Sequence, residues 1–350
     1  MMTLDQRIEK DLEALYNNGL KDLIAKFNQC KIQEAEDLSI ALFGKPNELS
    51  SHGLPGYFTG NRSARTVMVM LNPGQDVATH NNPQITDVLL KKLKITTGTL
   101  DEYLKGNELF GTYDKESKEN EEKYEEEVEK VARGKKEVEK KYIYPDSFDL
   151  KQAAFLKRWP DCGVKIDEKF PPSDDESNQI VNKEHTNYEL AKQTAEIVLR
   201  NKLQLELVPY ASRKFDGIKN YEPLFPFVET LFDEIFSEKY KGEEPRYVIF
   251  CADVFDKLFK SYNRNKEYPG WIEYDKQFYR NVSEDVFDKT QAYCTPIRIH
   301  FKGKERHRIE RPSLKAVIAH TFPNQALSKA YNRMVEYGKF CWETYCDSKI

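Results

Sequence analysis

The chain has 350 residues, of which 39% are hydrophobic and 32% charged, and its formal net charge is −4 at pH 7. This length suffices for one large domain or two modest ones, each with a buried core. The acidic total means that binding to nucleic acid requires a local basic patch. The six cysteines contain no Cys-x-x-Cys pair, which argues against a zinc ribbon, a thioredoxin motif or a four-cysteine iron–sulfur site.

The same features indicate where the protein works. Free thiols without a disulfide pattern are typical of a reduced cytoplasmic protein. The N-terminus is charged from its start, and no apolar run approaches the roughly 18 residues of a membrane span. We therefore expect a cytoplasmic protein with no export signal and no membrane partner.

The first elements in the chain are helices. Apolar residues at helical spacing predict two helices between Leu4 and Phe27, broken near residues 17–19. A third helix is predicted over residues 34–43, where Gly44-Lys45-Pro46 supplies the stop signal. Residues 1–50 are thus expected to form an N-terminal helical segment.

The rest of the chain, residues 51–350, has a different pattern. Four short apolar runs predict buried parallel strands at 67–71, 203–208, 247–251 and 316–319. Helical patterns at 187–201, 226–240 and 254–262 separate them. Strands that alternate with helices predict an α/β domain, here a three-layer αβα domain with a central four-stranded, mainly parallel sheet.

A long insertion, at about 98–190, separates the first two strands. Nineteen of its twenty-seven residues between Lys115 and Lys141 are charged, ten acidic and nine basic. Mixed charges at helical spacing are typical of a solvated helix or arm. The alternative is a lid or an arm that binds a protein partner.

Polar residues collect where the predicted strands end. Asn72-Pro73-Gly74 follows the first strand, Pro209 to Ser212 follow the second, Asp253 follows the third and His320 follows the fourth. In an open parallel sheet these ends meet at the edge where ligands bind. An amide or carboxylate and a histidine could there hold a water molecule on one side of a bond and stabilise a leaving anion on the other.

Three segments together resemble the uracil-DNA glycosylase superfamily: residues 56–61 (GYFTGN), residues 67–74 (VMVMLNPG), and a histidine-led loop from His320 to Ser328. The resemblance is closest to the mismatch-specific and single-strand-selective branches, whose first motif is an Asn-Pro-Gly turn. It spans roughly residues 53–330, and residues 98–190 are unmatched. It implies a DNA glycosylase that acts on an extruded base by attack of water at C1′. No lysine stands at a motif position, so we expect a monofunctional enzyme without a lyase step. His300 and His307 lack a third convincing ligand, and we expect a monomer without metal or cofactor.

The resemblance also implies two catalytic residues. Asn72 takes the place of the residue that orients the attacking water, with Asp76 as a second candidate. His320 takes the place of the histidine that donates to the pyrimidine O2 as the base leaves. The structural alternatives are an Asx turn or helix cap for Asn72 and a buried core histidine for His320.

Two positions bear on the identity of the base. Gly74 stands where the strict uracil enzymes have a tyrosine that blocks the space beside C5, so a C5-substituted pyrimidine could fit. Glu206 falls at or near the asparagine that contacts the edge of uracil, and a carboxylate suits the N4 amine of cytosine better. The alternative for Glu206 is a solvent-facing strand position. We therefore expect a modified cytosine rather than uracil, as in a defence against foreign or phage DNA, with Tyr57 or Phe58 stacking on the base.

Candidate DNA contacts lie in two places. Phe322 or Leu327 could intercalate where the base is extruded, or could pack in the core. The segment from Cys294 to Lys315 contains seven basic residues and only two glutamates. Its residues Pro296 to Lys304 have the pattern of a hairpin. This basic hairpin could neutralise the phosphates of DNA, or it could simply be solvated. The basic residues are Arg298, Lys302, Lys304, Arg306, Arg308, Arg311 and Lys315. Ser212, Arg213 and Lys214 form a second candidate contact.

Two other functional classes remain open. The chain could be a catalytically silent member of this fold that binds nucleic acid, or a protein through the insertion. It could also be an α/β enzyme that processes free nucleotides, because a fold alone does not determine function.

Overall fold

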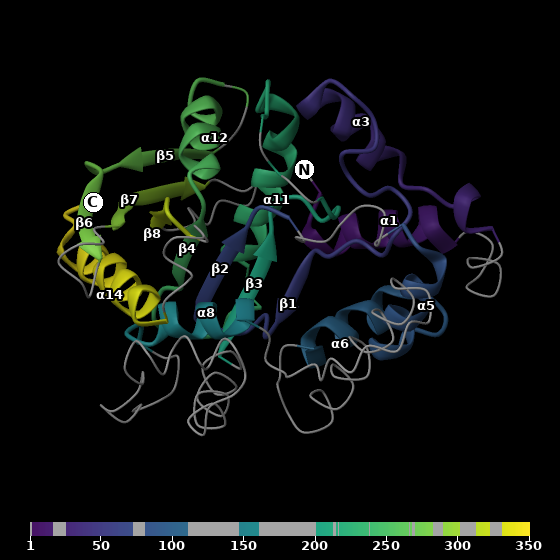
Figure 1. Ribbon diagram of the computed structural model, residues 1–350, viewed down its shortest axis with the longest axis horizontal. Helices are drawn as coiled ribbons and strands as arrows, with labels where there is room; N and C mark the ends of the chain where they lie inside the picture. Colours follow the sequence, from purple (N-terminus) through teal and green to yellow (C-terminus); the bar gives the residue numbers. More distant parts are fainter. Residues whose placement is uncertain are drawn as a thin grey trace.

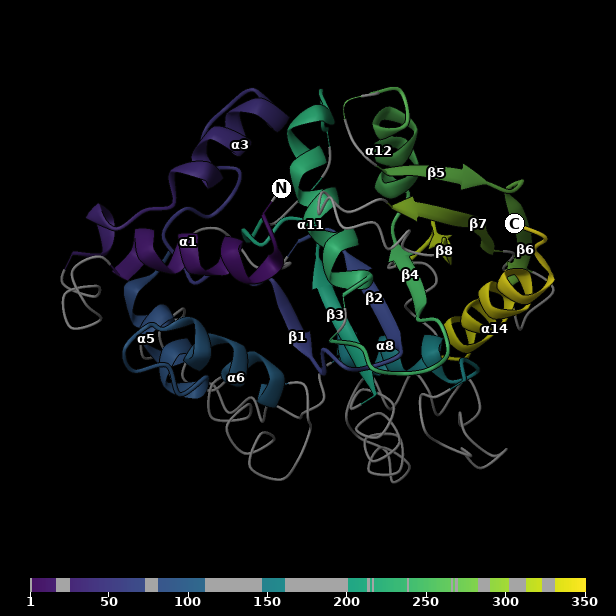
Figure 2. The same ribbon diagram turned by 180° about the vertical axis from the view of Figure 1, so that it is seen from behind.

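The computed structural model describes an α/β protein built on one mixed sheet (Figures 1 and 2). The described residues are 2–16, 26–72, 81–110, 147–160, 201–212, 215, 217–237, 239–265, 267, 270–282, 290–301, 313–322 and 331–350. The insertion is described only in part, and the predicted helix at 187–201 lies outside these residues. In the described part of the chain, no helix combines the length and the apolar character that crossing a membrane requires.

Four parallel strands form the centre of the sheet. β2 (Thr66–Met70) lies between β3 (Lys202–Glu206) and β4 (Tyr247–Cys251), and β8 (Leu314–Ala319) follows β4. Each strand falls on one of the four apolar runs in the sequence. The predicted positions and the parallel pairing of these strands are confirmed.

The sheet as a whole is larger and more mixed than the sequence predicts. β1 (Phe58–Gly60) pairs antiparallel with β3 at one end, and β7 (Thr290–Phe301) pairs antiparallel with β8. β5 (Gly270–Tyr274) and β6 (Phe278–Val282) both pair antiparallel with β7. The prediction of a four-stranded, mainly parallel sheet is therefore wrong in the number of strands and in the share of antiparallel pairs: over the residues that the structure describes, the sheet has eight strands, and four of its pairs are antiparallel. β5 and β6 keep several residues exposed or half-buried, so they lack the continuous apolar run of a buried parallel strand.

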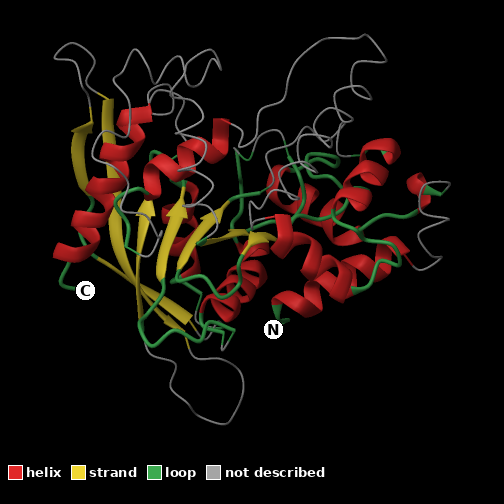
Figure 3. Ribbon diagram, turned by 90° about the horizontal axis from the view of Figure 1, so that it is seen from below, coloured by secondary structure: helices red, strands yellow, loops and turns green. Residues whose placement is uncertain are grey.

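Helices cover both faces of the sheet (Figure 3). On one face lie α1 (Leu4–Tyr16), α3 (Gln33–Phe43), α11 (Phe225–Ile235) and α12 (Val254–Tyr262), whose apolar residues share a core with every second residue of the central strands. The N-terminal helices thus belong to the same core as the sheet. α5 (Pro83–Lys92) and α6 (Leu100–Phe110) continue this layer beyond β1 (Figure 1).

α8 (Ser147–Leu156) and α14 (Tyr331–Asp347) cover the opposite face. They pack on the alternate residues of the same strands, among them Met68 and Met70 of β2. Because successive side chains of a strand point to opposite faces, a strand between two helical layers must be apolar throughout. This is why the central strands are visible in the sequence.

The ends of the helices follow local signals. α3 ends at Gly44, whose φ of 77° is the left-handed conformation that favours glycine at a helix C-terminus. α12 has its predicted bounds. α11 ends at Ile235, five residues before the predicted position, because Tyr240 does not join its apolar face. The Tyr240 hydroxyl instead donates to the carbonyl of Glu244, and its ring lies 4.9 Å from the guanidinium of Arg246.

The contact between α8 and α14 gives a prediction about stability. A Cβ atom at Gly338 would lie 1.8 Å from the carbonyl oxygen of Phe155, and the indole of Trp159 donates to the Gly338 carbonyl over 3.2 Å. We expect Gly338→Ala to lower the free energy of unfolding by about 2 kcal/mol because the helices must separate. The intrinsic preference of alanine for helix, about 1 kcal/mol, opposes this loss without cancelling it.

Urea denaturation measures the change. Glu336→Ala, at an exposed position of the same helix, is the control and should alter stability by no more than about 0.5 kcal/mol. Equal stabilities for the two variants would contradict the close approach of α14 to α8.

Candidate functional site

Polar side chains follow three neighbouring parallel strands at the edge where each strand ends. Asn72 lies two residues after β2, Asp253 two residues after β4, and His320 directly after β8. The chain runs from β2 to β3 on one side of β2 and returns to β4 on the other side. Ligands bind in open α/β sheets at such a reversal, outside the carboxyl ends of the strands. These three residues define the candidate site.

Asp253 and His320 form a pair across two strand ends. Nδ1 of His320 lies 3.1 Å from Oδ1 of Asp253, and Nζ of Lys257 lies 2.8 Å from Oδ2. Partial burial acts to raise the pKa of Asp253, but hydrogen bonds from Lys257 and His320 outweigh it and lower the pKa. Because an ionised carboxylate only accepts, Nδ1 of His320 carries a proton.

The other edge of the His320 ring is held by the antiparallel part of the sheet. Its Nε2 lies 2.8 Å from the Thr295 hydroxyl oxygen and 3.4 Å from the Gln277 amide nitrogen. The backbone N–H of His320 also donates to the carbonyl of Tyr293. The side chain of His320 is only 5% exposed, whereas that of Asp253 is 52% exposed. The ring is therefore fixed in place beside a carboxylate that reaches solvent.

Asn72 is oriented by the segment that follows β3. Its Nδ2 donates to the carbonyls of Tyr210 and Ser212, at 3.4 and 3.3 Å. Two carbonyl acceptors fix which side of the amide carries the nitrogen, so Oδ1 lies on the other side of Cγ. Asn72 thus holds an acceptor oxygen in a defined direction at the carboxyl edge of β2.

The sheet sets the distance between the two predicted catalytic residues. β4 separates β2 from β8, so two strand spacings place the backbones of Asn72 and His320 roughly 10 Å apart. The end of β4, with Asp253, lies between the two residues.

Glu206, at the end of β3, belongs to a buried polar row rather than to a solvent-facing surface. Lys202 donates to Gln204 on the same strand, and Gln204 donates to Oε1 of Glu206 over 2.7 Å. Gln152 of α8 accepts from Lys202, which shows that α8 covers this face. Oε2 of Glu206 is buried and has no hydrogen-bond partner among the described residues. The register pairs Glu206 with Met70, two residues before Asn72.

Burial controls the charge of Glu206. Loss of solvation raises its pKa to about 8, while the hydrogen bond from Gln204 and the charge of Lys202 oppose the change. The thiol of Cys251 on β4 is close enough to be affected by Glu206 and Lys202, and its own pKa is raised by burial. Glu206 is therefore mostly protonated at pH 7. Since Oε1 accepts from Gln204, the proton belongs on Oε2, which makes that atom a donor.

Three aromatic residues with predicted roles at the base or in the duplex lie in the core instead. Tyr57 is 2% exposed and donates through its hydroxyl to Asp11, and Phe58 is 1% exposed. Phe322 is 1% exposed and packs edge-on against Phe155. Stacking by Tyr57 or Phe58 and intercalation by Phe322 are corrected to core packing, because helices cover all three rings.

The predicted DNA contacts are only partly described. Ser212 is buried, and its carbonyl orients Asn72. Arg298 is half-buried on β7 and donates to Ser313. Residues 296–301 lie within β7, so the first arm of the predicted hairpin is a strand. Lys315 is half-buried on β8 and donates to the carbonyl of Ser348 over 2.6 Å. The remaining predicted residues lie outside the described part of the chain, namely Gly74, Asp76, Arg213, Lys214, Lys302, Lys304, Arg306, Arg308, Arg311 and Leu327.

Two residues of the site have no signal of their own in the sequence. Thr295 lies inside β7, and Gln277 lies in the short connection between β5 and β6. Neither follows a parallel strand. The predicted hairpin begins at Pro296, one residue after Thr295, and β5 and β6 were not predicted. Asp253, by contrast, follows its strand in the same way as Asn72 and His320.

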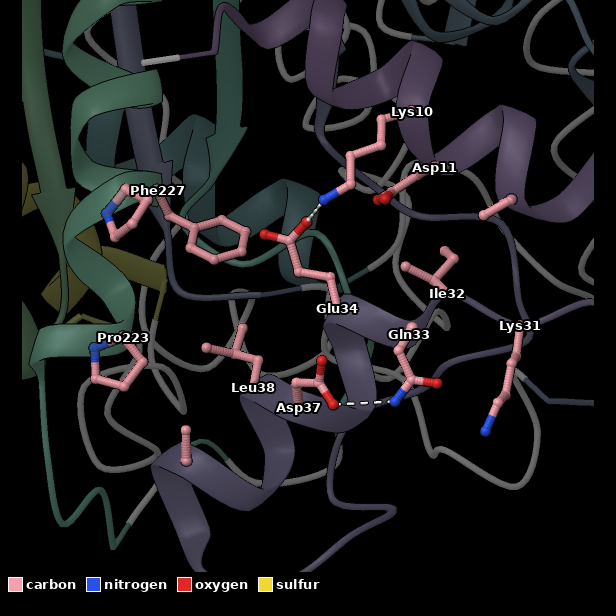
Figure 4. Close-up of a pocket in the computed structure, with 13 residues that line it drawn as sticks. Lys10, Asp11, Lys31, Ile32, Gln33, Glu34, Asp37, Leu38, Pro223 and Phe227 are labelled. Atoms are coloured by element: carbon pink, nitrogen blue, oxygen red, sulfur yellow. Dashed lines mark hydrogen bonds and ion pairs between the residues drawn. The ribbon is translucent and has the colours of Figure 1, made fainter.

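A separate cavity of about 500 Å³ lies in the helical layer, between α1, α3 and the segment from η2 (Glu222–Leu224) into α11 (Figure 4). The charged side chains that line it are partnered within the protein. Lys10 pairs with Glu34, and Asp11 accepts from Tyr57. Burial raises the pKa of Asp11 to about 6. None of the predicted catalytic residues lines this cavity.

Among the described residues, no group of three or more His, Cys, Asp or Glu side chains is arranged to hold a metal ion. His300 on β7 is 3.2 Å from Oε2 of Glu273, and its ring stacks on Trp271 with 3.8 Å between centroids.

No protein-family model, curated protein or solved structure matches the chain.

The buried carboxyl of Glu206 predicts a pH dependence of stability. Its pKa is about 8 in the folded state against an ordinary value of 4.5, so the folded state binds more protons between these pH values. The free energy of unfolding therefore falls as the pH rises through this window. Between about pH 5 and pH 9 we expect the wild type to lose on the order of 4 kcal/mol relative to Glu206→Gln, which cannot ionise.

Urea denaturation of both proteins at several pH values tests this expectation. Glu243→Gln, at an exposed position, is the control and should keep the profile of the wild type. Parallel profiles for the wild type and Glu206→Gln would show that Glu206 ionises normally.

Proposed function

We propose that this protein is a monofunctional DNA glycosylase that hydrolyses the N-glycosidic bond of an extruded pyrimidine. The observation that carries the proposal is the placement of an oriented amide, Asn72, and a histidine–carboxylate pair, His320 with Asp253, at one carboxyl edge of the sheet. Asn72 and His320 are the catalytic residues that the motif resemblance implies. Lys257, the lysine that the structure places in this arrangement, pairs with Asp253, and we propose water as the attacking group.

Asn72 would act on the water side of the bond. Its Oδ1 accepts a hydrogen bond from water and holds the water oxygen toward C1′ of the sugar. The amide is a weak base, so its contribution is position rather than proton removal. Because the Tyr210 and Ser212 carbonyls fix the amide nitrogen, the acceptor is oriented before substrate binds.

His320 would act on the side of the leaving base. With Nδ1–H directed at Asp253, a doubly protonated ring can donate from Nε2 to the pyrimidine O2 as negative charge develops there. The O2 atom then replaces Thr295 as the partner of Nε2. Asp253 balances the charge of the ring, and Lys257 in turn pairs with Asp253.

Glu206 would contact the 4-position of the base through Oε2. The protonated carboxyl donates, which suits the 4-oxo group of a uracil-type base. The ionised carboxylate accepts, which suits the 4-amino group of a cytosine-type base. A modified cytosine therefore remains a proposed substrate, but the burial of Glu206 makes the choice between the two bases depend on pH.

Asn72→Ala tests the proposed mechanism. We expect abasic-site formation to fall by at least about 100-fold, because the water loses its orienting acceptor, while the affinity for DNA is retained. The substrates are DNAs that carry uracil, cytosine, 5-hydroxymethylcytosine or glucosylated hydroxymethylcytosine, and abasic sites are detected by strand cleavage in alkali.

Asn265→Ala is the matched control, since this residue lies past the far end of α12 and should leave excision unchanged. DNA binding by the wild type without excision of any of these bases would favour the silent binding protein. Excision that persists in Asn72→Ala would remove the proposed role of this residue.

The protonation of Glu206 predicts a change in base preference. With a pKa of about 8, the ionised fraction rises from about one tenth at pH 7 to about nine tenths at pH 9. We expect the ratio of cytosine-type to uracil-type excision rates to rise by about 100-fold over this interval, because the ionised fraction rises about tenfold while the protonated fraction falls about tenfold. The ratio should be independent of pH in Glu206→Gln, and a wild-type ratio equally independent of pH would exclude a contact between Glu206 and the base.

A further inference from the structure

A second chemical feature lies beside the candidate site, on the hairpin of β6 and β7. β8 ends at Ala319, which pairs with Cys294, so residues 290–293 of β7 extend beyond the carboxyl edge of the parallel strands. β6 pairs with this extension. The hairpin therefore stands at the side of the sheet where the candidate site lies, and the N–H of His320 donates to the carbonyl of Tyr293 on β7. Figure 1 shows β6 and β7 beside the end of β8.

Two tyrosines lie opposite each other on this hairpin. Tyr279 of β6 pairs directly with Tyr293 of β7, and their ring centroids are 6.4 Å apart with the planes tilted by 41°. Alternation along the strand places Tyr293 on the same face as Thr295, whose hydroxyl contacts the ring of His320. The two tyrosines thus continue the face that carries the site.

Tyr293 is held firmly at its backbone. Its N–H donates to the hydroxyl of Thr321, and its carbonyl accepts from the N–H of His320 and from the hydroxyl of Tyr337. The hydroxyl of Tyr293 donates to Gln291 on the same strand. Tyr293 is therefore a fixed support that is tied to the residues directly after β8.

Tyr279 is the exposed member of the pair. It is 68% exposed, the largest exposed fraction among the large apolar side chains of the described residues. Its neighbour Arg280 points to the opposite face, where it pairs with Glu343 of α14 and lies 4.7 Å from the ring of Phe340. α14 therefore covers the other face of β6 and leaves the Tyr279 face open.

From this arrangement we infer that Tyr279, supported by Tyr293, is a stacking platform for an unpaired nucleobase that flanks the extruded one, so that the preferred substrate is single-stranded DNA. The position of the platform rests on the proposed function. Aromatic rings stack on the π-face of any base, but a base inside an intact duplex is already covered by its neighbours. The exposed side chain of Lys276, in the connection before β6, adds a positive charge for the phosphate backbone.

The test measures the affinity of single-stranded and duplex oligonucleotides by fluorescence anisotropy, in the Asn72→Ala background so that no base is removed. We expect Tyr279→Ala to weaken single-strand binding by about tenfold and duplex binding by less than about twofold. Tyr279→Phe keeps the ring and should bind as the parent does. Trp271→Ala removes an aromatic side chain that is 49% exposed on the other face of the sheet, and should also bind as the parent does.

Each other outcome overturns the inference. Single-strand binding that is unchanged in Tyr279→Ala would show that no base stacks there, and an equal loss in Trp271→Ala would show that the effect is not local. No single-strand binding by the parent would exclude the platform altogether. The comparison does not depend on excision, so a protein that removes no base can still confirm the platform, and an active glycosylase can still fail this test.

Discussion

The candidate site depends on the parallel pairing of β2, β4 and β8. Parallel strands in register must end at the same edge, so Asn72, Asp253 and His320 come together although they are far apart in the sequence. A slip of one residue in any of these strands would turn its apolar side chains to the wrong face and break both helical layers. The packing of two cores on opposite faces therefore also fixes the positions of the polar residues at the strand ends.

The central strands could be predicted because burial on both faces leaves a continuous apolar run in the sequence, as in Val67 to Met70. Of the antiparallel strands, β7 was predicted only from Pro296 onward, as an arm of a hairpin. β5 and β6 were not predicted, because their residues face different environments from one position to the next. Tyr279 and Arg280 are adjacent in β6, yet one is open to solvent and the other lies against α14. Such a strand has no apolar run, and its pairing with β7 depends on contacts that are distant in sequence.

The residues of the candidate site likewise divide into those that could be predicted from the sequence and those that could not. Asn72 and His320 follow predicted strands, so their placement at one edge could be inferred, whereas Thr295 contacts His320 only because β7 runs antiparallel beside β8. Whether an aromatic residue near a motif faces a ligand or the core depends on what covers it, which is why Phe322 could not be assigned from sequence. The protonation of Glu206 likewise comes from its burial, which is a property of the folded chain.

Two carboxyl groups at the edge of the sheet, those of Asp253 and Glu206, have opposite protonation states. Asp253 is half-exposed and partnered by Lys257 and His320, so it stays ionised. Glu206 is enclosed, one of its oxygens has no hydrogen-bond partner among the described residues, and it stays protonated. Pairs of titratable groups whose surroundings separate their pKa values are typical of sites that divide acid and base roles. In the proposed mechanism, the ionised Asp253 would support His320 on the side where negative charge develops, and the neutral Glu206 would contact the base without adding a second negative charge. An ionised Glu206 would repel the leaving anion, so the burial of Glu206 would favour the departure of an anionic base.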